Sequence, residues 1–582
     1  MATGRGPGSS HTQHIGAVWE DDNKIIVGID IGATYSGVAL TYLEKGEKQE
    51  LHRIARWPGQ GEEDLRSKIP TVIWYNLETK KAELFGAEAL SRDGREAAAD
   101  HGWKADMKLD PLPPGITLNQ IYSDFLGYLL KHTKAFVEKR MARGKEIWEK
   151  YKPRMEVVLA HPNGWDTPEQ HFLRKAAIDC GFVDFIIVSI TPTWVAGFRL
   201  EKTWLCATLG GSTVDTTLYT IVSSNPVVQL REVRVSDSIQ VGGILVNTKF
   251  EDLIRKALNN LELTPTQVDD FTEAGVEDFE TFVKRNFGNP DNSIFSSDTV
   301  SIRVANTGSY GDAPTKIHRG CMKVPGSAIK ECFDVCVIPI LSSVGEQLKD
   351  QTVQHILLVG GFGDSPYLHT QFKNRFEPDG CDVVLANDFT SKAVADGCVI
   401  WKMLCSVVSR TPRHSFGVIC ARACLPWMPG FLERDTYIGP QGIPVVLGRW
   451  VQIAKKGVPV DAEEVYRGTI HHCSTKSNPT SISLEMELFS YSGDDEPMWA
   501  KDNEGNLLPK FEKVCIIKAE VLDIEGALKK QTGLLGNEFW DLAVDVCICF
   551  GTTELQAYLE WEQNGVKRRG PATVVPGKPV EL

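Results

Sequence analysis

Two segments of the chain share one pattern, an apolar strand that is broken by glycine and small hydroxyl residues and then resumes. They read VGIDIGATYSGV at 27–38 and ATLGGSTVDTTL at 207–218. When Gly32 is aligned with Gly210, Thr34 falls on Ser212. Glycine turns expose backbone N–H groups that can bind phosphate oxygens. The repeat therefore predicts two equivalent β-hairpins, one in each half of this region, that could clamp a triphosphate between them.

A third glycine turn lies further along the chain, in LLVGGFGDSP at 357–366. A strand that ends in Gly-Gly and is followed by a Ser-Pro helix start lets a flat base approach the backbone. Up to about residue 405, segments with strand periodicity alternate with helical ones, which indicates a layered α/β architecture. One of the expected helices begins with a capping-box pattern at Thr117 and Gln120.

The sequence divides into three regions. Residues 1–23 are polar and rich in Gly, Ser and His, so we expect a flexible tail. Residues 24–410 carry all three glycine turns. After Arg410 short alternating strands separated by turn residues predict a mostly β domain over 411–582, with Asn564-Gly565 as a turn before the last strand.

Composition narrows the classes of function. The 582 residues include 63 basic and 76 acidic side chains, a net charge of −13, which argues against a nucleic-acid binder. No run of 18 apolar residues predicts a membrane span, and the first residues lack the apolar segment of a secretory signal. The 14 cysteines are a small fraction of the chain, and together with the missing signal they predict free thiols and a cytoplasmic location. They form no paired CxxC zinc pattern.

These motifs together resemble the 70-kDa heat-shock protein family, within the fold shared by actin, sugar kinases and heat-shock ATPases. The chain is most similar to a divergent branch, common in fungi, with an atypical C-terminal region. Besides the three turns, the resemblance rests on VLAHPNGWDTPEQHFLRKAAIDCGF, VGGILVNTKFEDLI and FGTTELQAYLEWEQNGVKRRGPATVV. It implies an α/β, two-lobed actin-like ATPase fold, followed by a mostly β C-terminal domain.

The resemblance also implies ATP or ADP and Mg²⁺ in the cleft between the lobes. Asp30 matches the carboxylate that holds Mg²⁺ through water, and Asp215 matches one near the metal and the attacking water. Lys104, or else Lys108, is the candidate for the lysine that positions this water. The nucleotide-binding positions are matched by Gly32, Ala33, Thr34, Tyr35, Gly210, Gly211, Ser212, Thr213, Gly242, Gly243, Lys284, Arg285, Gly360, Gly361 and Phe362. The alternative for the basic candidates is an ordinary solvated surface side chain. This applies to Lys104, Lys108, Lys284 and Arg285.

Three positions depart from the family pattern. Thr208 stands where the family has an aspartate, Ala33 replaces a Thr or Ser, and Thr191-Pro192 replaces a Glu-Pro pair. Backbone phosphate binding does not depend on these side chains, whereas hydrolysis uses carboxylates to hold metal-bound water. We therefore expect ATP binding with slow hydrolysis.

Three functions remain open at this point. The first is an ATP-binding, chaperone-like protein that contacts client or partner proteins through its C-terminal domain. The second is a pseudo-ATPase that binds ATP without meaningful turnover and acts as an interaction protein. The third is a small-molecule kinase of the same fold, which would need a second pocket with a general-base carboxylate.

Overall fold

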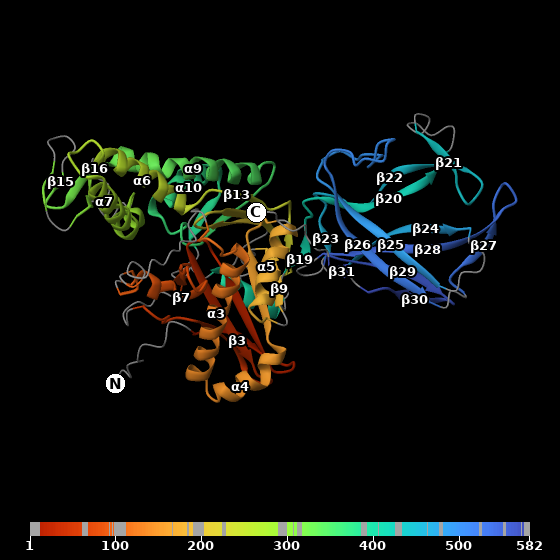
Figure 1. The fold of residues 1–582 in the computed structure, drawn as a ribbon, viewed down its shortest axis with the longest axis horizontal. Coiled ribbons are helices and arrows are strands. Elements are labelled where there is room, and N and C mark those ends of the chain that lie inside the picture. The colour runs from red at the N-terminus through yellow and green to blue at the C-terminus, as the bar shows by residue number, and fades with distance from the viewer. Residues whose placement is uncertain are drawn as a thin grey trace. The chain divides into compact units, whose positions relative to one another are not determined.

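The computed structural model describes residues 12–60, 68–91, 93–95, 97, 112–165, 167–182, 185–189, 203–223, 229–288, 299–305, 308–310, 317–385, 393–404, 407–424, 434–461, 464–475, 481–522, 526–550, 555–571 and 573–574. The chain divides into two compact units. Unit 1 comprises Met1–Gly164, Leu173–Ile221 and Asp237–Leu404, and unit 2 comprises Trp165–Phe172, Val222–Ser236 and Cys405–Leu582. Helices and strands together make this a mixed α/β protein (Figure 1).

The first sheet of unit 1 has the order β1-β4-β3-β2-β8-β9, and β5 pairs with β3. β2 is antiparallel to β3 and parallel to β8. The bounds are β1 (Thr12–Val18), β2 (Lys24–Asp30), β3 (Tyr35–Leu43), β4 (Lys48–Arg53), β5 (Lys68–Pro70), β8 (Glu156–His161) and β9 (Phe185–Ser189). Since β1 pairs with β4, the expectation of a flexible tail over 1–23 is wrong for Thr12–Val18.

A second sheet in unit 1 runs β18-β17-β10-β11, and β13 pairs with β11. β10 is antiparallel to β11 and parallel to β17, which is parallel to β18. The bounds are β10 (Thr203–Leu209), β11 (Val214–Ser223), β13 (Asp237–Ile239), β17 (His355–Val359) and β18 (Asp382–Leu385). The strand order and directions repeat those of β3, β2, β8 and β9, so the same arrangement occurs twice.

The register of the two hairpins confirms the repeat that the sequence predicts. Asp30 on β2 lies opposite Gly37 on β3. Thr208 on β10 lies opposite Asp215 on β11. Aligning Gly32 with Gly210 also aligns these two pairs, so the hairpins are equivalent residue by residue.

The helices of unit 1 connect and cover these strands. Their bounds are α1 (Gly86–Leu90), α3 (Leu118–Arg140), α4 (Gly144–Tyr151), α6 (Gly243–Leu258), α7 (Pro265–Asp278), α8 (Lys284–Asn286), α9 (Gly326–Leu348), α10 (Pro366–Phe376) and α11 (Ala393–Leu404), while α5 (Thr167–Asp179) includes residues of both units. The smaller strands are β6 (Ile73–Asn76), β7 (Lys81–Phe85), β14 (Thr299–Arg303), β15 (Ile317–His318) and β16 (Cys321–Pro325). Figure 1 shows α6, α7, α9 and β16 close together, and contacts join α6 to both α7 and α9.

Helix α11 packs closely on β2. A Cβ added at Gly28 would overlap the carbonyl oxygen of Ala395 and lie 2.8 Å from the Cβ of Cys398. Arg53, the last residue of β4, donates from Nε to Oδ2 of Asp396 on α11 over 2.7 Å. Both side chains are buried, with exposed fractions of 4% and 1%. This ion pair ties α11 to the first sheet.

Every regular element that the structure describes in 405–582 is a strand. Two sheets have the orders β21-β22-β20-β25-β26 and β24-β28-β29-β30. The unit 2 strands are β12 (Gln229–Glu232), β19 (Val407–Arg410), β20 (Ser415–Ala423), β21 (Thr436–Ile438), β22 (Pro444–Ala454), β23 (Val460–Asp461), β24 (Val465–Ser474), β25 (Ser481–Tyr491), β26 (Phe511–Leu522), β27 (Lys529–Thr532), β28 (Glu538–Cys549), β29 (Gln556–Gln563), β30 (Val566–Arg569) and β31 (Thr573–Val574). Leu488 and Ile517 from one sheet share a buried core with Val546 and Leu559 from the other, as packed sheets require.

All cysteines in the described part of the chain are free. Across the same residues, no helix combines the length and apolar character that a membrane span requires.

Candidate functional site

The second glycine turn is held by the first turn of α6. The N–H of Gly243 donates to the carbonyl of Gly210 over 3.2 Å, and the N–H of Ile244 donates to the carbonyl of Gly211 over 2.8 Å. In a trans peptide the C=O and the following N–H point in opposite directions. The N–H groups of Gly211 and Ser212 therefore face away from the helix.

These two N–H groups have no hydrogen-bond partner among the described residues. The same is true of the equivalent N–H groups of Ala33 and Thr34 in the first turn. All four belong to half-buried or exposed residues, and successive backbone N–H groups of this kind form anion-binding concavities. The two turns thus present matching sets of donors.

The two turns also share their backbone shape. A Cβ added at Gly32 would lie 2.6 Å from the carbonyl oxygen of Tyr35, and one added at Gly210 would lie 2.9 Å from that of Thr213. Real Cβ atoms essentially never come this close to another heavy atom. Each turn can therefore close as it does because it has glycine at this position.

The first and second turns contact each other. A Cβ added at Gly211 would lie 2.6 Å from Oγ1, 2.9 Å from Cγ2 and 3.3 Å from Cβ of Thr34. The three nearest atoms all belong to one side chain, so Thr34 fills the space beside Gly211. The sequence predicts that these two turns bind a triphosphate from opposite sides. In unit 1 the two turns are indeed neighbours.

We predict that Gly211→Ala weakens nucleotide binding by about tenfold or more, since the new methyl group must push Thr34 and its turn aside. Adding Thr34→Gly removes all three clashing atoms and should restore most of the affinity. Calorimetric titration with ATP of the single and double variants checks this. If Thr34→Gly brings no recovery, the loss does not come from this contact.

Asp30 has an ammonium partner that the sequence did not indicate. The Nζ of Lys68 lies 2.7 Å from Oδ2 of Asp30, and the two side chains are 18% and 11% exposed. Gly37 on β3 is paired with Lys68 on the neighbouring strand β5 and with Asp30 on the other neighbouring strand, β2. Because glycine has no side chain, the lysine can reach across β3 to the carboxylate.

Asp215 is also engaged. Its Oδ1 accepts the backbone N–H of Asn163 over 2.7 Å, and its Oδ2 accepts the hydroxyl of Thr213 over 3.4 Å. Asn163 follows β8 of the first sheet and also donates from Nδ2 to Thr217 over 3.1 Å. The carboxylate therefore links the second hairpin to the segment after β8. Opposite it, Thr208 is buried and neutral.

The third turn packs on the end of β10. The N–H of Phe362 donates to the carbonyl of Leu209 over 3.1 Å, and Gly360 has a φ of +91° that favours glycine. A Cβ added at Gly360 would also lie 2.5 Å from that same carbonyl oxygen. Gly361 is exposed, and a Cβ there would meet nothing within 4 Å. The turn leaves open space beside Gly361, next to the second hairpin.

Lys284 lies between the third turn and α6. Its Nζ donates to the carbonyl of Gly243 over 2.7 Å and to Oδ1 of Asn247 over 2.8 Å. A Cβ added at Gly243 would lie 3.5 Å from the ring of Phe362. The residue before Lys284 ends a π-helical turn, Phe279–Val283, a feature that often marks functional sites. Arg285 is exposed instead, so the two basic residues differ in their surroundings.

Gly242 is enclosed by backbone. A Cβ added there would overlap the carbonyl oxygen of Gly211, lie 2.6 Å from its carbon and 2.7 Å from the carbonyl oxygen of Gly210. Its own carbonyl accepts from the thiol of Cys336 over 3.3 Å. Burial raises the pKa of that thiol to about 11, so Cys336 stays a neutral donor at neutral pH.

Four of the residues singled out in the sequence lie outside the described residues: Lys104, Lys108, Thr191 and Pro192. Lys68 is a further basic residue, which the structure places beside Asp30. Its segment, RSKIP, has no glycine turn or spacing that would have identified it.

The described side chains do not fit a Mg²⁺ ion held by protein carboxylates. Asp30 already has a cation at 2.7 Å, and a divalent ion beside it would be repelled by that ammonium. Thr208 supplies no charge, and Asp215 accepts two donors. Among the residues that the structure describes, no three His, Cys, Asp or Glu side chains form a metal-binding group.

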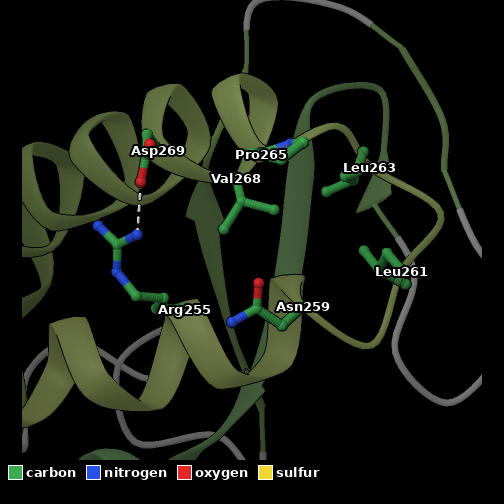
Figure 2. A pocket seen from close by; sticks show the side chains of 7 residues that line it. All are labelled: Arg255, Asn259, Leu261, Leu263, Pro265, Val268 and Asp269. Carbon is green, nitrogen blue, oxygen red and sulfur yellow. Dashed lines mark hydrogen bonds and ion pairs between the residues drawn. The ribbon is translucent and has the colours of Figure 1, made fainter.

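An open cavity of about 210 Å³ lies elsewhere in unit 1, between the end of α6 and the start of α7 (Figure 2). It is lined by Arg255, Asn259, Leu261, Leu263, Pro265, Val268 and Asp269. Arg255 and Asp269 form an ion pair of 2.5 Å across it. None of the residues predicted from the sequence lines this cavity, so it is separate from the glycine turns.

No protein-family model matches the chain, and no curated protein matches it. A solved structure that is similar is MreB5 of Spiroplasma citri bound to ADP, with 18% sequence identity and a TM-score of 0.43. The match covers 66% of this chain and 97% of that chain.

Proposed function

We propose that this protein binds ATP, with its phosphates held by the backbone of the two glycine hairpins and its adenosine against the third turn. The observation that supports this most is the set of N–H groups of Ala33, Thr34, Gly211 and Ser212, which lack partners among the described residues. Two equivalent turns that touch through Gly211 and Thr34 offer donors from both sides to one polyanion.

The surroundings of the third turn support a site for adenosine. Gly361 has open space beside it, while Phe362 and the Lys284 ammonium lie against Gly243. A glycine without neighbours lets a base approach the main chain. The Lys284 ammonium is held by two acceptors, so it keeps α6 and the helix of Lys284 in place beside the turn.

We propose that hydrolysis is slow or absent. Turnover needs a group that orients the attacking water and stabilises the charge that develops. The carboxylates of Asp30 and Asp215 are both hydrogen-bonded within the protein, and Thr208 is neutral. This favours a nucleotide-responsive interaction protein over an efficient ATPase. A chaperone-like role, in which 411–582 contacts client or partner proteins, remains part of the proposal on the strength of the family resemblance alone.

The test is thermal unfolding of the full chain with and without ATP. A ligand at about 100 times its Kd stabilises the native state by about 2.7 kcal/mol, which should raise the Tm of unit 1 by about 3 °C or more. Tripolyphosphate should reproduce part of this shift, because it fills the hairpins without using the third turn. If saturating ATP leaves the Tm unchanged, the glycine turns are not a nucleotide site.

A further inference from the structure

We propose that Lys68, and not a divalent cation held by Asp30, supplies the positive charge that meets the phosphates, so that ATP binds this chain without Mg²⁺. The inference rests on the proposed function, because it concerns the same site. The family resemblance assigns the Asp30 carboxylate to a metal, whereas the structure places an ammonium beside it.

The position of Lys68 follows from the sheet. β5, β3 and β2 lie side by side, and Lys68, Gly37 and Asp30 occupy one row across them. Adjacent strands are about 4.8 Å apart, so a long side chain is needed to span two strand spacings. The Lys68 and Asp30 side chains together cover this distance, and the missing side chain of Gly37 leaves their path open.

The ammonium has donors to spare. It carries three N–H groups, and Asp30 is its one partner within the described part of the chain. Asp30 is the last residue of β2, so the ammonium lies where the first glycine turn begins. The N–H groups of Ala33 and Thr34 belong to the same turn. A phosphate bound there would therefore meet backbone donors together with a nearby full positive charge, which makes charge-assisted hydrogen bonds.

In the described strands of the second hairpin, the position equivalent to Lys68 carries no charge. Ser238 on β13 lies opposite Asp215, as Lys68 on β5 lies opposite Gly37. In the first sheet, the paired positions on β5, β3 and β2 hold Lys68, Gly37 and Asp30. The equivalent positions on β13, β11 and β10 of the second sheet hold Ser238, Asp215 and Thr208. In the second sheet the acidic residue, Asp215, is on the middle strand, and Ser238 stands at the position equivalent to Lys68. Among these paired positions of the described strands, Lys68 is therefore the residue that provides a cation.

The wild-type chain tests the proposal without any substitution. Calorimetry with ATP is run once in excess EDTA and once in excess Mg²⁺. We expect the two Kd values to agree within about threefold, since the ammonium supplies a positive charge beside the phosphates in both buffers. Binding in Mg²⁺ alone overturns the inference and leaves the proposed function intact. Absence of binding in both buffers contradicts the proposed function itself, and the inference with it.

Substitution of Lys68 gives a second test with a specific sign. Lys68→Met should weaken ATP binding in EDTA by about tenfold or more, as loss of a charge-assisted contact does. Mg²⁺ should then recover part of the loss, because Asp30 is open to metal-bound water once its ammonium is gone. An unchanged Kd in EDTA overturns the inference. Lys24→Met is the matched control: Lys24 forms a 3.2 Å ion pair with Glu156 at the other end of β2, and its loss should leave both Kd values unchanged.

If Lys68→Met does not fold, Asp30→Asn tests whether the positive charge at the site comes from Lys68 or from a metal held by Asp30. The change keeps the size of the side chain and removes the charge that offsets the ammonium. We expect ATP binding in EDTA to be unchanged or about threefold tighter, because the cation faces one fewer competing anion. If Asp30 holds a metal instead, the variant should lose ATP binding in Mg²⁺ by about tenfold, and that result would overturn the proposal.

Discussion

Arg53→Met is expected to lower the free energy of unfolding of unit 1 by about 3–5 kcal/mol. The guanidinium donates to Asp396 over 2.7 Å, and neither side chain is more than 4% exposed. Methionine keeps most of the length of the side chain, so the loss comes chiefly from leaving the Asp396 charge without this partner. Asp396 lies on α11, which packs against β2 and β3. The packing of α11 on the first sheet should therefore weaken as well.

Urea unfolding followed by tryptophan fluorescence measures the change. Because the chain has two compact units, the transition of unit 1 is assigned first from the shift that ATP produces. Arg255→Met is the control, since its ion pair with Asp269 is 40% and 66% exposed and such pairs contribute about 0–1 kcal/mol. Arg53→Met with Asp396→Leu should lose less than Arg53→Met alone. A loss below about 1 kcal/mol for Arg53→Met would contradict the buried pair.

Gly242→Val is expected to reduce ATP affinity by about 100-fold or more, to below detection. A Cβ at this position would overlap backbone atoms of Gly210 and Gly211, and backbone cannot rotate away as a side chain can. The hydrogen bonds from Gly243 and Ile244 to that turn would then break. The N–H groups of Gly211 and Ser212 would lose their orientation, which is what the proposed phosphate site depends on.

The control for this change is Gly345→Ala. Gly345 lies inside α9, and a Cβ there would meet nothing within 4 Å, so we expect ATP affinity to stay unchanged. Circular dichroism establishes that each variant is folded, and calorimetry with ATP measures the affinity. Normal affinity in a folded Gly242→Val protein would show that the link between α6 and the second turn is not needed for binding.

Local sequence determined the features that depend on a few neighbouring residues. Glycine followed by hydroxyl residues between apolar runs predicted both hairpins, and their registers agree with the alignment of Gly32 and Gly210. Asn564 and Gly565 form the expected turn, with φ values of 53° and 73°, and Ser365 accepts the N–H of Leu368 at the start of α10. Turn and cap preferences are local, so they can be read from a short stretch of sequence.

Tertiary structure decided which distant groups meet. Gln120, expected to complete a capping box, donates its side chain to the carbonyl of Lys80 over 3.0 Å, while Thr117 still accepts the N–H of Gln120. The pairing of Lys68 with Asp30 joins residues 38 positions apart through a third strand. Nothing in RSKIP distinguishes that lysine from a solvated one. Periodicity reports which face of an element is apolar, but the order of strands in a sheet determines which side chains cross it, and that order places a cation beside Asp30.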